Sequence, residues 1–409
     1  MRRLHAVPPR RHVASVLRLT RLTLTEFRNY AALTWRPTAR ISVLHGPNGS
    51  GKTNLLEAVS LLVPGRGLRG ARNADLPRQG VPAHSVRAWG VAGRFQTAEG
   101  DTDIGTGSAP DGASDRGASD RRVFRMNGAT PRSQAEIVGR IAAVWLTPRM
   151  DRLFLDGLSG RRRFLDRLVW ALEPNHAREM AAHDTAMGNR NRLLCEGRHD
   201  RAWLAGLEDA MARHAVAASA ARLSLVNRLN AQPAGRFPAA RMTLACPIAE
   251  RLAHEPALAV EDWLRAGLEA SRARDAAAGT TALGAHRTDM LLTDLATGTA
   301  AALASTGQQK ALLIGVVLSH AALIAATRGF WPLLLLDEPA VHLDNDRRDK
   351  LFEVLAELPA QTFLTGTDGD TFLPLAEHAE AFAAGDGGLR QDRRFLMQQE
   401  ASSPVAGPL

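Results

Sequence analysis

One loop has the residue types of a phosphate-binding site. Its residues are Gly46, Pro47, Asn48, Gly49, Ser50, Gly51, Lys52 and Thr53, and they match the pattern G-x-x-x-x-G-K-[ST] in full. Backbone N–H groups of such a loop surround a phosphate, and the positive end of the next helix adds attraction. We expect Lys52 to reach the β- and γ-phosphates of a nucleotide and the Thr53 hydroxyl to ligate Mg²⁺. The alternative, a chance glycine-rich turn, fits the flanking strand and helix patterns poorly.

Two adjacent carboxylates follow an apolar run later in the chain. Leu333 to Leu336 has the composition of a strand buried on both faces, and Asp337 and Glu338 stand at its carboxyl end. Ligands of open α/β sheets bind at that edge. We expect Asp337 to hold Mg²⁺ through water and Glu338 to orient and deprotonate the attacking water. An acidic strand end alone is often a solvated turn, so this assignment depends on the phosphate loop upstream.

A third motif lies between these two. Ser305, Gly307 and Gln308 form a turn that opens a predicted helix, where backbone N–H groups could make a second anion site. The alternative role for Ser305 is a simple helix cap. The turn resembles the signature motif of ABC-type ATPases, and residues 341–344 resemble their D-loop, with Asp344 as its acid. In that superfamily the signature motif meets the γ-phosphate bound by the other subunit.

An arginine cluster is a further candidate. Arg161, Arg162 and Arg163 stand beside a predicted helix start and could contact DNA phosphates. From the residues alone, a solvated or acid-paired helix face is the favoured explanation.

The elements that position these motifs divide the chain. Strand patterns such as Ile41–His45 dominate before residue 154, helical spacing dominates 155–278, and strands return in 279–385. The expected fold is α/β: a two-lobed ABC-type (P-loop) ATPase head, completed by both chain ends, with an inserted compact helical lobe. Residues 1–15 are expected to be a disordered basic extension, 96–121 a flexible insertion, and 386–409 a frayed tail.

Composition restricts the partners. The net charge is +9, and the cations are almost all arginine, with lysine only at Lys52, Lys310 and Lys350. A basic chain favours polyanions such as nucleic acid or an anionic membrane surface.

Cys195 and Cys246 have no further cysteine at metal-ligand spacing, which indicates a reducing compartment and no disulfide framework. We find no uninterrupted run of 18 apolar residues and therefore expect no membrane span.

The spacing of the motifs indicates one branch of the superfamily. Lys52 and Asp337 lie 285 positions apart, farther than in transporter ATPases, as in the SMC-like branch that inserts an arm between the lobes. Beyond spacing, the chain resembles the RecF family of bacterial recombination and gap-repair proteins over nearly its whole length. The blocks that carry the resemblance are residues 24–30, 52–58, 160–166, 284–289, 305–311 and 364–368.

Some positions depart from the family pattern. Ala285 stands where proline is usual, and residues 145–150, in the expected Q-loop region, contain no glutamine. The Q-loop ligand therefore remains unassigned. Gly366 replaces the switch histidine of transporter-type relatives, as in RecF-like chains.

The resemblance implies a function and partners. It implies ATP with Mg²⁺, an ATP-dependent homodimer, and binding of single-stranded and gapped or double-stranded DNA. It implies roles in recombinational gap repair, DNA replication and the SOS response, with RecO and RecR assisting the loading of RecA. ATP hydrolysis would be weak, DNA-dependent and a switch, and the location cytoplasmic and nucleoid-associated. The alternatives are a soluble or transporter-associated ABC ATPase without DNA function, a small-molecule kinase, and an organellar form in which the basic N-terminus is a transit peptide.

Overall fold

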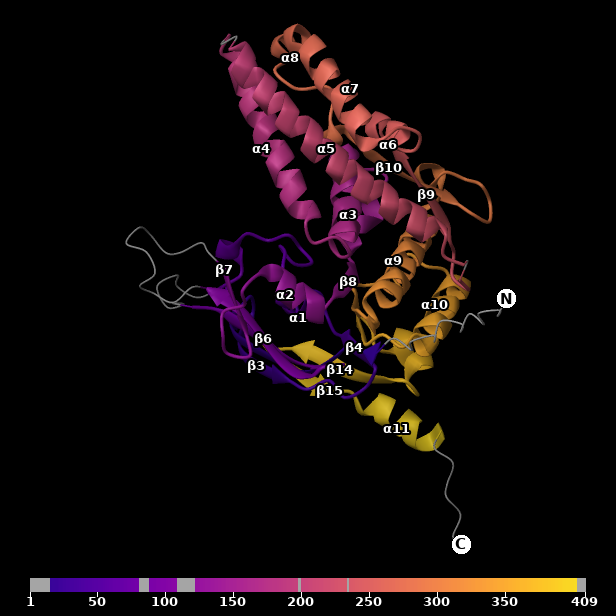
Figure 1. Ribbon diagram of the computed structural model, residues 1–409. Coiled ribbons are helices and arrows are strands. Elements are labelled where there is room, and N and C mark those ends of the chain that lie inside the picture. The colour runs from indigo at the N-terminus through magenta and orange to yellow at the C-terminus, as the bar shows by residue number, and fades with distance from the viewer. Residues whose placement is uncertain (1–14, 81–87, 109–121, 198–199, 234, 403–409) are drawn as a thin grey trace, which may run out of the picture. The chain divides into compact units, whose positions relative to one another are not determined.

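The computed structural model describes residues 15–80, 88–108, 122–197, 200–233 and 235–402 (Figure 1). The chain divides into two compact units. The first comprises 1–145, 321–337 and 355–409, and the second comprises 146–320 and 338–354. These units differ from the predicted domains. The signature turn and the D-loop belong to the same unit as the helices, whereas the phosphate loop belongs to the other unit.

A parallel sheet forms the core of the first unit. Within the described residues its strand order is β15-β14-β4-β13-β12-β8, and β14, β4, β13 and β12 run parallel. The strands are β4 (Ile41–His45), β8 (Ala143–Leu146), β12 (Leu333–Leu336), β13 (Thr362–Gly366), β14 (Ala379–Gly385) and β15 (Gly388–Gln391). Every residue of β12 is buried, which confirms the strand predicted from the apolar run.

An antiparallel sheet, ordered β3-β2-β5-β6-β7, completes this unit. Its strands are β2 (Arg18–Phe27), β3 (Tyr30–Trp35), β5 (Gly90–Thr97), β6 (Gly100–Ser108) and β7 (Arg122–Met126). Helix α1 (Lys52–Leu62) packs on β5 and β6 and also on β13 of the parallel sheet. This unit also contains α2 (Gln134–Arg140) and the short strands β1 (Ser15–Val16) and β11 (Phe330–Trp331), which pair with each other.

The flexible insertion predicted at 96–121 is wrong for its first part. Residues 100–108 form β6, in which Thr102, Ile104 and Thr106 alternate as buried residues. The glycine, aspartate and serine content indicated a loop, but the β-branched residues Thr102, Ile104 and Thr106 fit a half-buried strand face. Residues 109–121, and 1–14 of the predicted basic extension, lie outside the described residues.

The frayed tail predicted from residue 386 is also wrong in part. Strand β15 pairs with β14, and α11 (Arg393–Ser402) follows it. Phe395 anchors this helix because its side chain is fully buried, and the Asp392 N–H donates to the Ala381 carbonyl at 2.8 Å. One buried aromatic residue in a polar segment was too weak a signal to predict this order.

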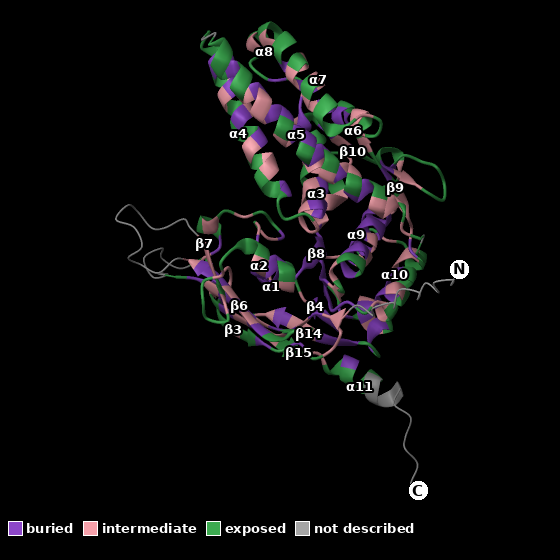
Figure 2. Ribbon diagram, in the orientation of Figure 1, coloured by how far each residue is buried: buried purple, intermediate pink, exposed green. Residues whose placement is uncertain are grey.

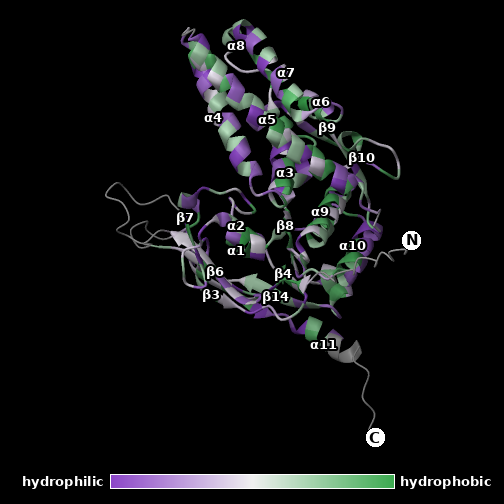
Figure 3. Ribbon diagram, viewed as in Figure 1, coloured by the Kyte–Doolittle hydropathy of each residue, from purple (hydrophilic) through white to green (hydrophobic). Residues whose placement is uncertain are grey.

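Helices dominate the second unit. They are α3 (Leu158–Trp170), α4 (His176–Cys195), α5 (Arg201–Asn230), α6 (Pro247–Leu252), α7 (Ala257–Ala270) and α8 (Arg272–Ala278). The helical spacing predicted for 155–278 is confirmed along α5: Leu204, Met211, Ala215 and Leu225 are buried, and Figure 2 shows buried and exposed residues alternating along the helix. Hydrophilic and hydrophobic residues likewise alternate on α4 and α5 in Figure 3. Strands β9 (Ala240–Ala245) and β10 (Asp289–Asp294) pair antiparallel.

Two helices continue from the second unit into the first, α9 (Thr306–Arg328) and α10 (Asn345–Glu357). Among the described residues, α9 is long and apolar enough to cross a membrane, which the search for uninterrupted apolar runs overlooked. However, 78% of its most apolar window is buried inside the structure. It therefore has the character of a core helix.

Candidate phosphate site, signature turn and arginine cluster

The phosphate loop lies between β4 and α1, as predicted. Gly46, Gly49 and Gly51 have φ values of 141°, 83° and 104°, which side chains rarely adopt. Gly51 is also confined sterically, since a Cβ atom there would lie 2.6 Å from the Tyr30 hydroxyl. Two requirements thus select glycine at position 51, and the loop conformation depends on it.

The start of α1 is electrostatically positive. No side chain caps its first turn and no acidic residue lies in that turn. The Lys52 ammonium is almost fully buried and donates to the carbonyl oxygens of Gly46 and Pro47, at 2.7 and 2.8 Å. A helix N-terminus combined with an ammonium group is suited to a polyphosphate.

Two hydroxyls converge on one carboxylate at the end of β12. Thr53 Oγ1 donates to Asp337 Oδ1 at 2.9 Å, and Thr365 Oγ1 donates to the same oxygen at 2.7 Å. Asp337 is only 3% exposed. Hydroxyl and carboxylate oxygens are the ligands that Mg²⁺ prefers, so the residues present fit this ion. Thr365 lies in a block quoted for the family resemblance, but nothing in the sequence assigned it this contact.

A buried ion pair links the segments that precede and follow the phosphate loop. The Arg28 guanidinium donates to both carboxylate oxygens of Glu57, each at 2.8 Å, and Glu57 is completely buried. Asn29 Oδ1 accepts from Asn54 Nδ2 at 2.7 Å. The family-like blocks before and after the phosphate loop are therefore joined to each other, a contact that a single sequence cannot show.

The strand that enters the loop is tied to the C-terminal segment. His45 Nε2 lies 3.0 Å from Asp392 Oδ2. A hydrogen bond from Arg394 is the main cause that lowers the pKa of Asp392 to about 2, and burial is the main cause that lowers the pKa of His45. The segment expected to be frayed therefore contacts the base of the phosphate loop.

The signature turn, in the second unit, is a capping box. The Gln308 N–H donates to Ser305 Oγ at 3.3 Å, and the Ser305 N–H donates to Gln308 Oε1 at 2.9 Å. Ser305 thus has the helix-cap role weighed from the sequence, yet it remains exposed. A Cβ atom on Gly307 would lie 2.6 Å from the His342 carbonyl oxygen, so the D-loop packs against this turn.

The two acids around the D-loop differ. Asp344 is exposed and caps α10, accepting from the Arg347 N–H at 2.8 Å. Glu338 follows Asp337 directly in the chain and has a left-handed φ of 51°. It belongs to the second unit, whereas the phosphate loop belongs to the first.

The three candidate DNA-contacting arginines have separate environments. Arg161 donates to both carboxylate oxygens of Asp289, at 2.7 and 3.0 Å, which matches the acid-paired alternative. Arg162 is half-buried, and burial is the main cause that lowers its pKa. Arg163 is exposed on the surface of α3. Among the three, Arg163 is the one best placed to meet an external polyanion.

Arg222 is fully buried and contacts two of the blocks that carry the family resemblance, residues 160–166 and 284–289. Arg222 donates to both oxygens of Asp166, at 2.7 and 2.9 Å, and to the Ala285 carbonyl at 2.7 Å. Nearby His286 donates from Nε2 to the Thr281 carbonyl at 2.9 Å, and burial is the main cause that lowers its pKa to about 4. The family-like blocks 160–166 and 284–289 therefore hold the helical unit together.

Comparison with known proteins finds similar sequences over most of this chain. The model of the RecF/RecN/SMC N terminal domain matches residues 18–382. The "DNA replication and repair protein RecF" of Mesorhizobium japonicum is 45% identical over 367 residues, covering 88% of this chain and 94% of that protein. The protein of the same description in Agrobacterium fabrum is 44% identical over 376 residues, covering 91% and 98%.

Solved structures agree on the fold. The recombination mediator protein RecF-ATPrS in the RecFOR pathway superposes with a TM-score of 0.78 at 22% identity, covering 93% of this chain and 99% of that one. The corresponding RecF-ATP structure has a TM-score of 0.73 at 22% identity, covering 92% and 99%. These likenesses confirm the predicted α/β fold of an ABC-type ATPase head.

Proposed function

We propose, from the premise that this chain belongs to the RecF family of DNA replication and repair proteins, that it is an ATP-dependent DNA-binding protein. It acts in DNA replication, recombinational gap repair and the SOS response. The observation that carries the proposal is the convergence of Thr53 and Thr365 on Asp337 beside a complete phosphate loop, in a chain this similar to RecF proteins. The same relatives disfavour a transporter-associated ATPase or a small-molecule kinase.

The phosphate loop binds ATP in this proposal. Loop N–H groups and Lys52 neutralise the phosphates, and Thr53 and Asp337 would hold Mg²⁺. That ion, when bound, supplies neutralisation of the charge that develops on the phosphates. Glu338 orients the attacking water and accepts its proton. Hydrolysis is slow and resets the protein.

A second copy of the chain completes the site. Ser305 and Asp344 are exposed and Gly307 and Gln308 are half-buried, so the signature turn is accessible to an external partner. We infer that this turn contacts the nucleotide held by the other subunit, giving an ATP-dependent homodimer that closes on single-stranded or gapped DNA. The net charge of +9 and the exposed Arg163 support the DNA contact.

The family also suggests partners and a location. We infer that RecO and RecR act with this protein to load RecA and that it works in the cytoplasm at the nucleoid. Both cysteines of the described chain are free, which agrees with a reducing compartment.

Sedimentation of the protein with ATP and with ADP tests the dimer. We expect a shift from monomer to dimer with ATP alone, and Ser305→Arg should abolish the shift because its bulk occupies the contact with the other subunit. ATP binding by the Ser305→Arg monomer, measured by titration with a fluorescent ATP analogue, is the control. A dimer that forms equally in both nucleotides contradicts the proposal.

A further inference from the structure

One buried lysine connects three segments that are distant in the sequence. Lys310, in the second turn of α9, is only 1% exposed. Its ammonium donates to Asp151 Oδ2 at 3.2 Å and to the Glu338 carbonyl oxygen at 2.8 Å. Asp151 lies in the short helix Pro148–Arg152, and all three residues belong to the second unit.

The Glu338 backbone needs such a contact. Its φ of 51° is left-handed, a conformation that is unfavourable for an ordinary residue and persists only when neighbouring groups hold it. The Val341 N–H also donates to the Glu338 carbonyl, but at 3.4 Å. The shorter bond from a charged donor is the stronger of the two. The direction in which the Glu338 side chain leaves the backbone thus depends on Lys310.

Asp151 is the carboxylate that pairs with the Lys310 ammonium. Burial raises the pKa of Asp151, and the neighbouring charge of Lys310 acts in the opposite direction, followed by that of His342 in the D-loop. Lys310 is likewise surrounded by protein, so each charge compensates for the other in an environment that disfavours isolated ions. Asp151 directly follows residues 145–150, the segment that lacks the expected Q-loop glutamine.

We propose that Lys310 is a positioning residue for Glu338, coupling the signature turn to the group that activates water. Lys310 lies in α9, five residues after Ser305, which caps that helix, so a displacement of the signature turn by a second subunit's nucleotide moves the ammonium. The Glu338 carbonyl moves with the ammonium. The Glu338 carboxylate thereby moves into or out of the orientation in which it activates water. This inference rests on the proposed ATPase function and adds a route by which dimerisation controls hydrolysis.

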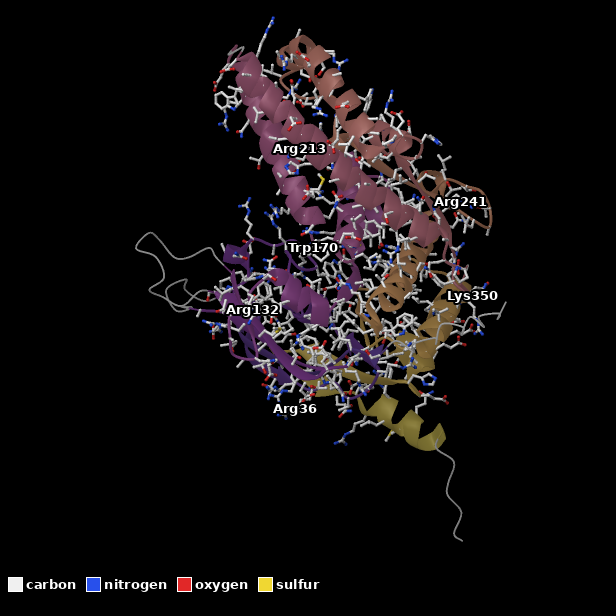
Figure 4. All side chains as sticks on the ribbon, viewed as in Figure 1. Arg36, Arg132, Trp170, Arg213, Arg241 and Lys350 are labelled. Carbon is white, nitrogen blue, oxygen red and sulfur yellow. The ribbon has the colours of Figure 1, made fainter. Side chains whose placement is uncertain are left out.

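Lys310→Met tests the coupling. We expect kcat for ATP hydrolysis to fall about 10- to 100-fold, as for other small displacements of a reacting group, while the Kd for ATP changes less than about threefold. Lys310→Arg keeps the charge and should recover part of kcat. Lys350→Met is the matched control, because Lys350 is an exposed lysine on α10 (Figure 4) and should leave both quantities unchanged.

A double variant separates positioning from the burial of charge. Lys310→Met leaves the Asp151 carboxylate without its counterion, which lowers stability. Adding Asp151→Asn removes that charge and should recover the thermal midpoint but not kcat, since the Glu338 carbonyl still lacks the shorter hydrogen bond from Lys310. Recovery of kcat in the double variant, or wild-type kcat in Lys310→Met, would overturn the inference. Absence of hydrolysis by the wild type itself would instead refute the proposed function.

Discussion

Replacement of Gly51 by alanine tests how tightly the phosphate loop is built. At φ 104° an alanine incurs about 1–2 kcal/mol of backbone strain. Its Cβ atom would lie 2.6 Å from the Tyr30 hydroxyl, and Tyr30 is fully buried, so the ring must shift within a packed core. Such overpacking adds about 1–3 kcal/mol. The expected loss in free energy of unfolding is therefore about 2–5 kcal/mol.

Gly49→Ala supplies the matched comparison. Gly49 also has a left-handed φ, 83°, but nothing lies within 4 Å of its would-be Cβ atom. Only the strain of about 1–2 kcal/mol is expected there. Urea denaturation of both variants without nucleotide measures the difference, and near-ultraviolet circular dichroism reports the environment of Tyr30. Equal losses in the two variants would refute the claim that steric confinement, and not φ alone, selects glycine at position 51.

Three further predictions concern charged side chains. Asp392 has a folded-state pKa of about 2, below its ordinary value, so its stabilising contribution is present above about pH 4 and is lost as the pH falls towards 2. The difference in unfolding free energy between the wild type and Asp392→Asn should therefore shrink over that range. Arg161→Ala should cost about 2 kcal/mol of stability because it leaves the Asp289 carboxylate unpaired, as denaturant unfolding will show. Arg163→Ala should leave stability unchanged and lower DNA affinity with a reduced salt dependence; the reverse assignment of effects would contradict the roles given to these two arginines.

The local features of the fold were predictable from the sequence. The strand Ile41–His45, the position of the phosphate loop and the helical spacing along α5 are confirmed because each depends on the spacing of neighbouring residues. The turn at Ser305 was predicted with two possible roles, and its capping role is visible in the structure. The nucleotide and metal roles of these residues stay predictions.

Contacts between distant segments were not predictable. The Arg28–Glu57 pair and the Lys310–Asp151 pair join residues that no local pattern connects. Strand β6 was missed for another reason: its threonine and isoleucine suit a packed strand face, yet the glycine, aspartate and serine between them indicated a loop. Tertiary packing decided the structure in each case.

DNA binding in defined nucleotide states tests the central claim most directly. The affinity for a gapped duplex is measured with ATP, with ADP, and for Glu338→Gln with ATP, each at two salt concentrations. We predict tight, salt-sensitive binding with ATP alone, strengthened in Glu338→Gln because the closed dimer cannot hydrolyse its ATP. Equal binding in all three states would mean that arginine charge alone attracts DNA, and the ATP-dependent switch would be wrong.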